Sequence, residues 1–296
     1  MDKEFLNHCP SCGSATHHEI FECTDHFISG EKFPVVNCAA CGLLFTNPRP
    51  AHASISTYYD SDAYVSHSKT RSGLINALFH LSRTYTLARK RNLVRRYSSG
   101  RDLLDYGCGT GDFLKTMRSS GFSCSGIEPN EDARQKAMSP ENISILDEDG
   151  LEHFNKSSFD VITLWHVLEH VYPLTTRLSQ FNELLREDGR LFIAVPNHRS
   201  WDAKRYGPYW AAWDVPRHIY HFNRNSITDL MLRHGFTLVK TRPQLLDAFY
   251  ISLLSEKYQS GRQNIFRACL NGLRSNFSAR FMDGNYSSII YIFKKS

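Results

Sequence analysis

Residues 103–114 of this chain read Leu-Leu-Asp-Tyr-Gly-Cys-Gly-Thr-Gly-Asp-Phe-Leu, which predicts a short buried strand, a tight glycine turn and the start of a helix. Gly107, Gly109 and Gly111 lack a β-carbon where the backbone must turn sharply and let a ligand approach closely. The following helix directs its free N–H groups at the same point. Glu128 lies 17 positions after Gly111, at the end of a second apolar stretch. A glycine turn with a later acid is how a βαβ unit holds an adenosine-containing ligand, because the carboxylate accepts from ribose hydroxyls.

Length and composition indicate an ordinary globular protein. The chain has 296 residues and a formal net charge of +5, which favours one core of roughly 200 residues with attachments. The N-terminus is charged and lacks an apolar signal core, and no stretch approaches the roughly 18 apolar residues of a membrane span. We therefore expect a cytoplasmic protein with no membrane span. The eight cysteines then indicate bound metal or buried thiols rather than disulfides.

The first 50 residues carry two C-x-x-C pairs, each followed by glycine. They are Cys9 with Cys12 and Cys38 with Cys41, and 25 residues separate the pairs. Each pair forms a turn that presents two thiolates to one ion, and four thiolates at tetrahedral geometry select Zn²⁺. With no open position, such a site is structural, and it supplies folding energy that so short a segment lacks. We predict a structural zinc site in a ribbon-like module.

A basic stretch precedes the glycine turn. Apolar residues recur at helical spacing from Leu74 to Tyr97. The stretch contains no acid and eight basic residues, which are Arg71, Arg83, Arg89, Lys90, Arg91, Arg95, Arg96 and Arg101. We interpret this as a long helix with a solvated basic face. An anionic partner such as phosphate, nucleic acid or a lipid headgroup is the alternative.

From Arg101 the pattern alternates strand and helix, which predicts a parallel sheet covered by helices on both faces. The expected strands are 103–106, 123–127, 143–146, 159–165, 190–195, 236–241 and 286–293, and the expected helices are 113–119, 130–138, 174–186 and 226–234. Residues 198–222 break this rhythm with three tryptophans and three tyrosines, and residues 243–284 form a helical insertion. We predict three parts, namely a zinc module at 1–50, a helical linker or cap at 51–100 and a cofactor-binding domain at 101–296.

These features together resemble the class I S-adenosylmethionine-dependent methyltransferases. The likeness rests on residues 103–114, on Glu128, on the strand 159–165 running into Val-Leu-Glu-His-Val at 167–171, and on the strand that ends at 195–197. It covers roughly residues 101–241 and 286–294, and the Leu-Glu-His-Val segment is similar to the ubiquinone-type, small-molecule branch. The four-cysteine module resembles that of certain sugar C-methyltransferases and glycan-locus methyltransferases. The resemblance implies a seven-stranded sheet in the order 3-2-1-4-5-7-6 with the last strand antiparallel.

The resemblance also implies which residues bind the cofactor S-adenosylmethionine. Asp105 and the backbone of the glycine turn would meet its methionine portion, Glu128 would take both ribose hydroxyls, and residues 148–151 would flank the adenine without a clear contact. The full set is Asp105, Gly107, Cys108, Gly109, Gly111, Glu128, Pro129 and His166. A capping role at the end of its strand is the alternative for Asp105.

Methyl transfer to a hydroxyl or an acidic carbon needs a base for the departing proton, and histidine titrates in the right range. The candidates are His166, His170, His198, His218 and His221. We favour His166 for its position after the fourth strand, and His218 because Asp214 and Arg217 flank it in the aromatic segment. Core or surface positions are the alternative for each.

We therefore predict methyl transfer to a hydroxyl or carbon of a small molecule, either a glycan or nucleotide-sugar precursor or a quinone-like ring. RNA is the first alternative, docked through the zinc module and the basic helix, although no Asn/Asp-Pro-Pro-aromatic motif follows the fourth strand. A zinc hydrolase using His166, Glu169 and His170 is a second, because H-x-x-E-H on a helix would share one face. A dinucleotide-binding site is a third alternative, which the turn disfavours because it reads G-x-G-x-G and not G-x-G-x-x-G. A non-catalytic module that senses the cofactor is a fourth. The sequence leaves the oligomeric state open.

Overall fold

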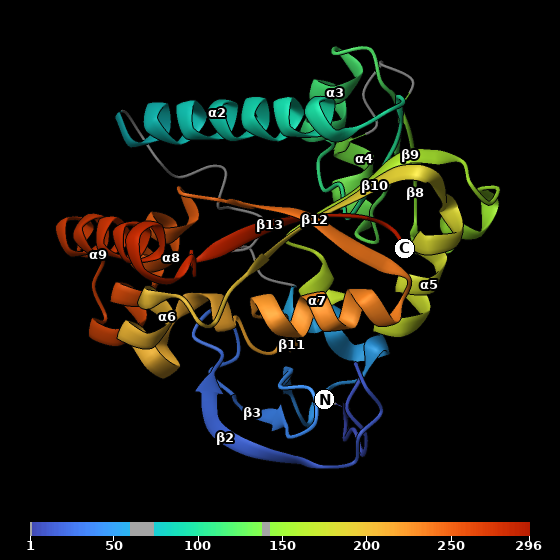
Figure 1. Ribbon diagram of the computed structural model, residues 1–296. Helices are drawn as coiled ribbons and strands as arrows, with labels where there is room; N and C mark the ends of the chain where they lie inside the picture. The colour runs from blue at the N-terminus through green and yellow to red at the C-terminus, as the bar shows by residue number, and fades with distance from the viewer. Residues whose placement is uncertain (1, 60–73, 138–142) are drawn as a thin grey trace.

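The computed structural model describes residues 2–59, 74–137 and 143–296, with the backbone alone for residues 74–81. Its centre is a seven-stranded sheet (Figure 1). The strands follow one another across the sheet as β8 (Ser144–Leu146), β7 (Ser123–Ile127), β6 (Asp102–Tyr106), β9 (Phe159–Trp165), β10 (Leu185–Pro196), β13 (Ser288–Lys295) and β12 (Phe236–Pro243). Only β13 runs antiparallel to both of its neighbours, which confirms the predicted order and the predicted antiparallel last strand.

Neighbouring residues along the central strands enter different cores because side chains alternate across a sheet. Leu104, Ile162 and Ile193 belong to one buried cluster, and Leu103, Val161 and Phe192 belong to another. The first cluster includes residues of α5 (Leu174–Leu184) and α7 (Arg224–Arg233), and the second includes residues of α2 (Leu74–Tyr97), α3 (Asp112–Arg118) and α4 (Glu131–Ala137). Apolar runs such as 159–165 are therefore buried on both sides, as predicted for a parallel sheet.

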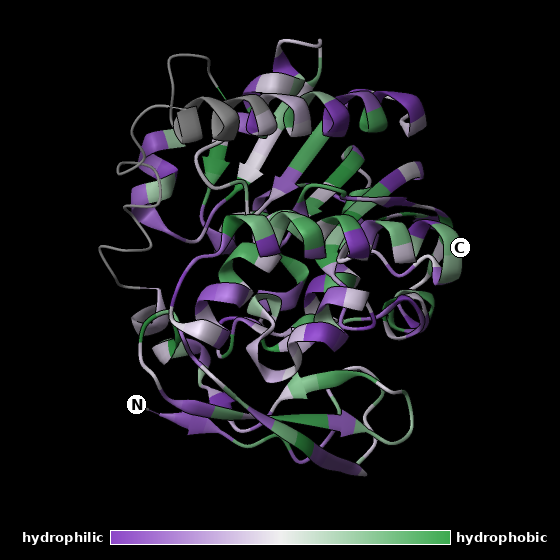
Figure 2. Ribbon diagram, turned by 90° about the vertical axis from the view of Figure 1, so that its left-hand side faces the viewer, coloured by the Kyte–Doolittle hydropathy of each residue, from purple (hydrophilic) through white to green (hydrophobic). Residues whose placement is uncertain are grey.

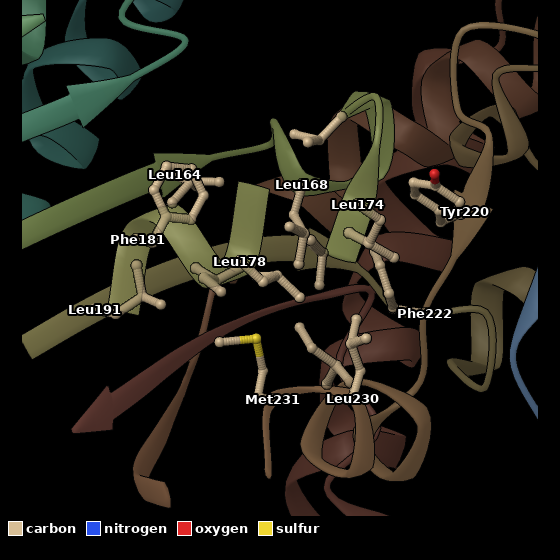
Figure 3. Packing of buried hydrophobic residues seen from close by; sticks show 14 of the residues in the cluster. Leu164, Leu168, Leu174, Leu178, Phe181, Leu191, Tyr220, Phe222, Leu230 and Met231 are labelled. Carbon is tan, nitrogen blue, oxygen red and sulfur yellow. The ribbon is translucent and has the colours of Figure 1, made fainter. Parts of the chain in front are cut away.

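Figure 3 shows the first cluster from close by. Leu178 and Phe181 of α5 lie on the same side as Leu164 and Leu191 of the sheet, and Met231 of α7 lies opposite them. All five are buried side chains. This packing fixes α5, and with it the short connection between β9 and α5 that carries residues 166–171.

Most of the predicted elements differ from the observed ones by one or two residues at an end, and the strand predicted over 190–195 begins five residues earlier, at Leu185. The helix predicted over 174–186 ends at Leu184 because Leu185 already pairs with Phe159 in the sheet, and the ladder resumes at Arg190 after a register shift. The helix predicted over 130–138 is observed as Glu131–Ala137, and residue 138 lies outside the described residues, as does Arg71 of the basic stretch.

The N-terminal segment forms a second sheet, which also includes one strand from residues 220–221, far along the chain. Its order is β11 (Tyr220–His221), β4 (Leu44–Thr46), β3 (Lys32–Cys38) and β2 (His17–Thr24). A two-stranded ribbon of β1 (Lys3–Glu4) and β5 (Arg49–Pro50) and a 3₁₀ helix at His52–Tyr58 complete it. Tyr220 pairs with Phe45, so the aromatic segment is joined to this module by backbone hydrogen bonds. The predicted domain boundaries stay a prediction.

The insertion between β12 and β13 is helical, as predicted, and comprises α8 (Asp247–Ser260), α9 (Ile265–Ser278) and a π-helical turn at Ala279–Asp283. It packs beside α6 (Trp201–Tyr206). Buried Asp202 joins these parts: its carboxylate accepts from Trp210 Nε1 at 2.8 Å, from Ser275 Oγ at 2.6 Å and from Ser287 Oγ at 2.6 Å. One carboxylate thus holds α6, α9 and the approach to β13 together.

In Figure 2 the N-terminal sheet lies at the bottom of the molecule and α2 crosses the top. Among the residues that the structure describes, no helix is long and apolar enough to cross a membrane.

Candidate functional site

The glycine turn joins β6 to α3 with all three glycines at positive φ, between +55° and +73°. A β-carbon on Gly107 would stand 2.5 Å from Val167 Cγ2, so that glycine is needed for packing. A β-carbon on Gly109 would meet nothing within 4 Å. The turn is therefore closely packed at Gly107 and open at Gly109, where a ligand could approach the backbone.

Glu128 follows β7 and clasps this turn. Its Oε2 accepts from the Gly109 N–H at 2.7 Å, and its Oε1 accepts from the Asn130 N–H at 2.9 Å. The carboxylate is nearly buried, and each oxygen keeps a lone pair for a further donor. The chemistry of this donor set fits the two hydroxyls of a ribose. Cys108, in contrast, directs its sulfur toward Gly126 and belongs to the core.

Asp105, at the end of β6, is buried under the turn and accepts from Thr163 Oγ1 at 2.5 Å. Burial raises its pKa to about 7, although the nearby Lys90 ammonium opposes this rise. Lys90 comes from α2 and its Nζ lies 4.5 Å from the centre of the Trp165 ring. Burial lowers the pKa of Lys90, and the charges of Asp247 and Asp105 act against that. Lys90 thus lies near Asp105, Asp247 and the Trp165 ring.

His166 follows β9, with φ +61°, and its N–H donates to Ala194 O. Its Nε2 lies 2.9 Å from Asp247 Oδ2 and 2.7 Å from the Gln244 amide, and its Nδ1 lies 3.4 Å from Glu169 Oε1. Burial lowers the pKa of His166, but the Asp247 and Glu169 carboxylates outweigh burial and raise it to about 9. In the free protein His166 is therefore a cation at neutral pH.

Glu169 lies at the centre of a cluster of histidines. Its side chain is fully buried, and neither carboxylate oxygen accepts a hydrogen bond. Its Oε1 is 4.0 Å from His218 Nε2, so His166 and His218, 52 residues apart in sequence, face the same oxygen. Burial raises the pKa of Glu169, but the neighbouring histidines more than offset this and hold it below its usual range.

The tautomer of His218 follows from its other partner. His218 Nδ1 lies 2.8 Å from Ala212 O, and a carbonyl can only accept, so Nδ1 carries the proton. The neutral ring then presents a lone pair at Nε2, which faces Glu169 and, at 3.9 Å, Asp214 Oδ2. His170 is held in the same manner, with Nδ1 2.9 Å from Arg217 O, and its ring meets that of His218 edge to face. Burial lowers the pKa of His170 to about 4.

The alternative in which His166, Glu169 and His170 share one face of a helix does not fit the structure. Residues 168–170 form only a 3₁₀ turn, and Val167 leaves the helical region with φ −133°. The side chains that could share a metal ion here are Glu169, His170 and His218, without His166. The positive φ of His166 and the backbone conformation of Val167 break the helical spacing.

Arg217 connects this cluster to the N-terminal module. The guanidinium is 1% exposed and donates to Asp214 Oδ1 at 2.7 Å, to Asp25 Oδ1 at 2.9 Å and to Tyr58 O at 3.0 Å. Asp25, at the end of β2, is also 1% exposed, and its carboxylate caps the turn at residues 27–29. His218, one residue after Arg217, is therefore positioned in part by the N-terminal segment.

The remaining histidine candidates lie apart from the cluster. His198 contacts Asn223 and stacks on Trp213, and buried His221 pairs with Thr46 Oγ1. Most rings of the aromatic segment, residues 198–222, belong to the core. Trp210, Trp213, Tyr206 and Tyr220 are buried, the first three against β2–β4 and α8. Trp201 differs, because it lines a cavity.

That cavity, about 1630 Å³ in volume, lies between α2, the end of β12 and the helices α8 and α9. Seven of its lining residues are lysine or arginine and two are aspartate. Gln244 and Asp247, the partners of His166, are part of its wall, as is Lys90. The cavity therefore reaches the groups around His166 and carries a positive balance of charge.

The four cysteines of the N-terminal pairs converge. Cys9 Sγ lies 3.6 Å from Cys41 Sγ and Cys12 Sγ lies 3.6 Å from Cys38 Sγ, and all four sulfurs fall within 4.8 Å of one another. A tetrahedral Zn²⁺ with Zn–S bonds of about 2.3 Å places its sulfurs about 3.8 Å apart. Gly13 and Gly42, both at positive φ, close the two knuckles. The donor set fits a structural zinc ion.

Sequence reasoning missed several residues of the site. Asp25 accepts from Arg217, which lies 192 positions later in the chain, so no local signal marks it. Lys90 is one cation among many on its helix, and Asp247 reads as an ordinary acid at a helix start. Glu169 alone could have been singled out from the sequence, because a carboxylate is unusual in an apolar segment such as Val-Leu-Glu-His-Val at 167–171.

A family model described as a methyltransferase domain matches residues 79–241. A ubiquinone biosynthesis O-methyltransferase from Glaesserella parasuis is 35% identical over 109 residues, which are 33% of this chain and 46% of that protein. One from Actinobacillus pleuropneumoniae serotype 7 is 26% identical over 172 residues, 54% of this chain and 73% of the relative. The chain thus spans about half the length of the first of these relatives.

Two solved structures have a similar fold. The magnesium protoporphyrin IX methyltransferase from Synechocystis, solved with bound S-adenosylhomocysteine, is 12% identical with a TM-score of 0.54, over 83% of this chain and all of that one. A SAM-dependent methyltransferase from Archaeoglobus fulgidus is 18% identical with a TM-score of 0.52, over 79% of this chain and all of that one.

Proposed function

This chain belongs to the methyltransferase-domain family within the class I S-adenosylmethionine-dependent methyltransferases, and we propose that it transfers a methyl group to a hydroxyl or carbon of a small molecule. The observation that carries the proposal is the Glu128 clasp on a glycine turn that is open at Gly109. S-adenosylmethionine, when bound, supplies a methyl group on a sulfonium that needs little activation beyond alignment.

The residues proposed to hold the cofactor are those that the resemblance indicated. Glu128, beside Pro129, would accept from the ribose. The backbone of the turn at Gly107, Cys108, Gly109 and Gly111 would lie against the ligand, while its N–H groups donate within the protein, to Ile127 O, Glu128 Oε2 and Cys108 O. Asp105 and His166 would lie at its methionine end. Lys90 adds a cation there, which suits the carboxylate of an amino-acid group.

For the base we propose His218. Its Nδ1–H is fixed on Ala212 O, so its Nε2 can take a proton, and the buried Glu169 carboxylate stabilises the resulting cation. His166 already carries a proton at neutral pH because Asp247 and Glu169 hold it, so its proposed role is to donate a hydrogen bond and a positive charge. This assignment separates two histidines that the sequence treated alike.

The acceptor class is a proposal supported by the relatives and by the cavity. The ubiquinone-biosynthesis relatives are named O-methyltransferases, which supports a hydroxyl on a quinone-like ring. The excess of cations around the cavity supports an acceptor with negative charge, such as a nucleotide sugar or phosphorylated glycan precursor. We also propose that Cys9, Cys12, Cys38 and Cys41 bind one structural Zn²⁺ in a module that positions Arg217 through Asp25.

Calorimetry with S-adenosylhomocysteine tests the cofactor proposal. We expect micromolar binding to the full chain, abolished when Glu128→Ala is combined with Gly109→Val, while Glu131→Ala, an exposed acid on α4, binds as the wild type does. Absence of heat with the wild type would overturn the proposal.

A panel of acceptors tests the substrate class. Tritiated S-adenosylmethionine is incubated with the full chain and nucleotide sugars, catechols or RNA. Label in a sugar or catechol fraction is expected, whereas label in RNA, with binding that weakens steeply with salt, contradicts the small-molecule class. Metal analysis should give one zinc per chain, lost in Cys9→Ser.

A further inference from the structure

Helix α9 has its apolar side turned outward. The buried positions of α9 are small or polar, namely Ala268, Asn271, Gly272 and Ser275, and Ala279 of the following turn continues them. The large apolar side chains are exposed, namely Phe266, Leu270, Leu273 and Phe277 of α9 and Phe281 of the turn. Phe266, Phe277 and Phe281 are each at least 65% exposed. Such a face is the reverse of a helix that covers a core.

The contacts on the buried face of α9 explain why the helix turns its large apolar side chains outward. A β-carbon on Gly272 would stand 2.6 Å from the Phe249 ring, so α9 and α8 approach too closely for a larger residue. Asn271 donates to Tyr206 OH at 2.9 Å, and Ser275 donates to the buried Asp202 carboxylate at 2.6 Å. These bonds fix the rotation of α9, so its aromatic stripe is a fixed feature of the fold.

The segment around this stripe is basic. Residues 257–282 contain no aspartate or glutamate and five cations: Lys257, Arg262, Arg267, Arg274 and Arg280. An apolar stripe flanked by arginines is the composition of a helix that lies in the surface of an anionic bilayer. Figure 2 views the molecule from the side that carries α8 and α9 in Figure 1.

We propose that α9 and the turn at Ala279–Asp283 seat the protein on a bilayer that contains anionic lipid. The exposed phenylalanines would enter the boundary between headgroups and acyl chains, and the arginines would contact headgroup phosphates. A second copy of this chain is the less suitable occupant, because a two-fold interface on this face would bring one arginine-rich surface against another. The proposal does not depend on the methyl-transfer chemistry.

The exposed apolar side chains of α9 lie at the edge of the cavity described above. Leu273, Phe277 and Phe281 also line the cavity between α2 and α9. Docking through α9 would therefore bring the rim of that cavity to the lipid surface. A rim at the surface lets an amphiphilic molecule pass between bilayer and cavity without crossing water.

Flotation of the full chain with vesicles tests the proposal. We expect binding to phosphatidylcholine vesicles with about one-third phosphatidylglycerol and at least tenfold weaker binding to pure phosphatidylcholine. The double variant Phe277→Ser, Phe281→Ser should lose about tenfold or more in partitioning. Arg274→Gln with Arg280→Gln should weaken binding about fivefold per arginine and reduce its salt dependence.

The matched controls come from α7, on which Leu232 is 60% exposed and Arg233 is also exposed. Leu232→Ser and Arg233→Gln should bind vesicles as the wild type does. Because the altered side chains are exposed, thermal unfolding should be unchanged and loss of binding cannot be assigned to misfolding. No binding to anionic vesicles overturns the proposal. A wild-type dimer in solution that Phe277→Ser dissociates overturns it as well, since the face would then cover a second copy.

Discussion

The two ends of the site are built in different ways. The proposed cofactor end comes mainly from one continuous stretch, residues 103–130, to which Lys90 and His166 are added. Its centre is the Glu128 carboxylate, which accepts from two backbone N–H groups. The acceptor end brings together side chains from Asp25, Glu169, Arg217, His218 and Asp247, which span more than 220 positions of the chain. The first depends on local backbone geometry and the second on long-range packing.

This difference shows where each end is vulnerable. A turn that binds through its backbone tolerates changes in the rest of the molecule, because glycine conformation and the βα junction define it. A cluster of buried charges has no such independence. The buried carboxylates and Arg217 stay charged in the interior because oppositely charged neighbours compensate their desolvation, so removal of one partner leaves another unpaired. The four predictions that follow test this contrast, from the largest expected effect to the smallest.

Substitution His218→Ala should separate the two ends most strongly. If His218 is the base, kcat for the acceptor that the labelling panel identifies falls about 1,000-fold, while affinity for S-adenosylhomocysteine stays within about twofold. Steady-state kinetics and calorimetry measure the two quantities. His198→Ala is the control, since that ring contacts Asn223 outside the cluster. An equal loss in both variants would exclude His218 as the base.

Substitution Asp25→Asn should show that the acceptor end depends on the N-terminal module. Arg217 then remains buried with Asp214 alone, and the free energy of unfolding should fall by about 3 kcal/mol. Urea denaturation measures this loss. The exposed pair of Glu22 with Lys32, on the same sheet, supplies the control, because Glu22→Gln should change stability by less than about 0.5 kcal/mol. If Asp25→Asn and Glu22→Gln both change the free energy of unfolding only slightly, the ion pair between Asp25 and Arg217 does not couple the N-terminal module to the acceptor end.

Substitution Glu128→Gln should affect the cofactor end alone. The amide keeps one acceptor oxygen but loses the charge that strengthens hydrogen bonds from Gly109, Asn130 and the ribose, so affinity for S-adenosylhomocysteine should fall about 30-fold. Calorimetry measures this change. Unfolding of the N-terminal module, followed by zinc release, should be as in the wild type, and a shared loss would contradict the independence of the two ends.

His166 predicts a pH dependence of stability. Its pKa is about 9 in the folded protein against about 6.5 when unfolded, so its contribution is complete below pH 6.5 and disappears as the pH rises through 9. Between those values the cofactor-free wild type should lose about 2 kcal/mol more than His166→Gln. Urea titrations at both ends of this window measure the difference. Parallel curves would mean that Asp247 and Glu169 do not hold the proton on His166.

Features that depend on local sequence were predicted accurately, and features that depend on long-range packing were not. Strands 123–127 and 159–165 were predicted to the residue, because a run of apolar residues between turn signals defines a buried strand locally. The four cysteines were found from spacing alone, since a knuckle is a local turn. The alternative of a helical face shared by His166, Glu169 and His170 did not fit because the backbone turns at His166, with φ +61°, and no local pattern reports that turn.

By itself the sequence determined the alternation of strands and helices, the glycine turn with its acid, and the pairs of thiolates, because periodicity and turn chemistry act over a few residues. The strand order was implied by the family resemblance. The tertiary structure alone decided which histidine keeps a free nitrogen, which carboxylate is left buried without a donor, and which side of α9 faces outward. Those properties depend on distances between remote segments. Desolvation and the charges of neighbours set them, and both exist only once the chain has packed.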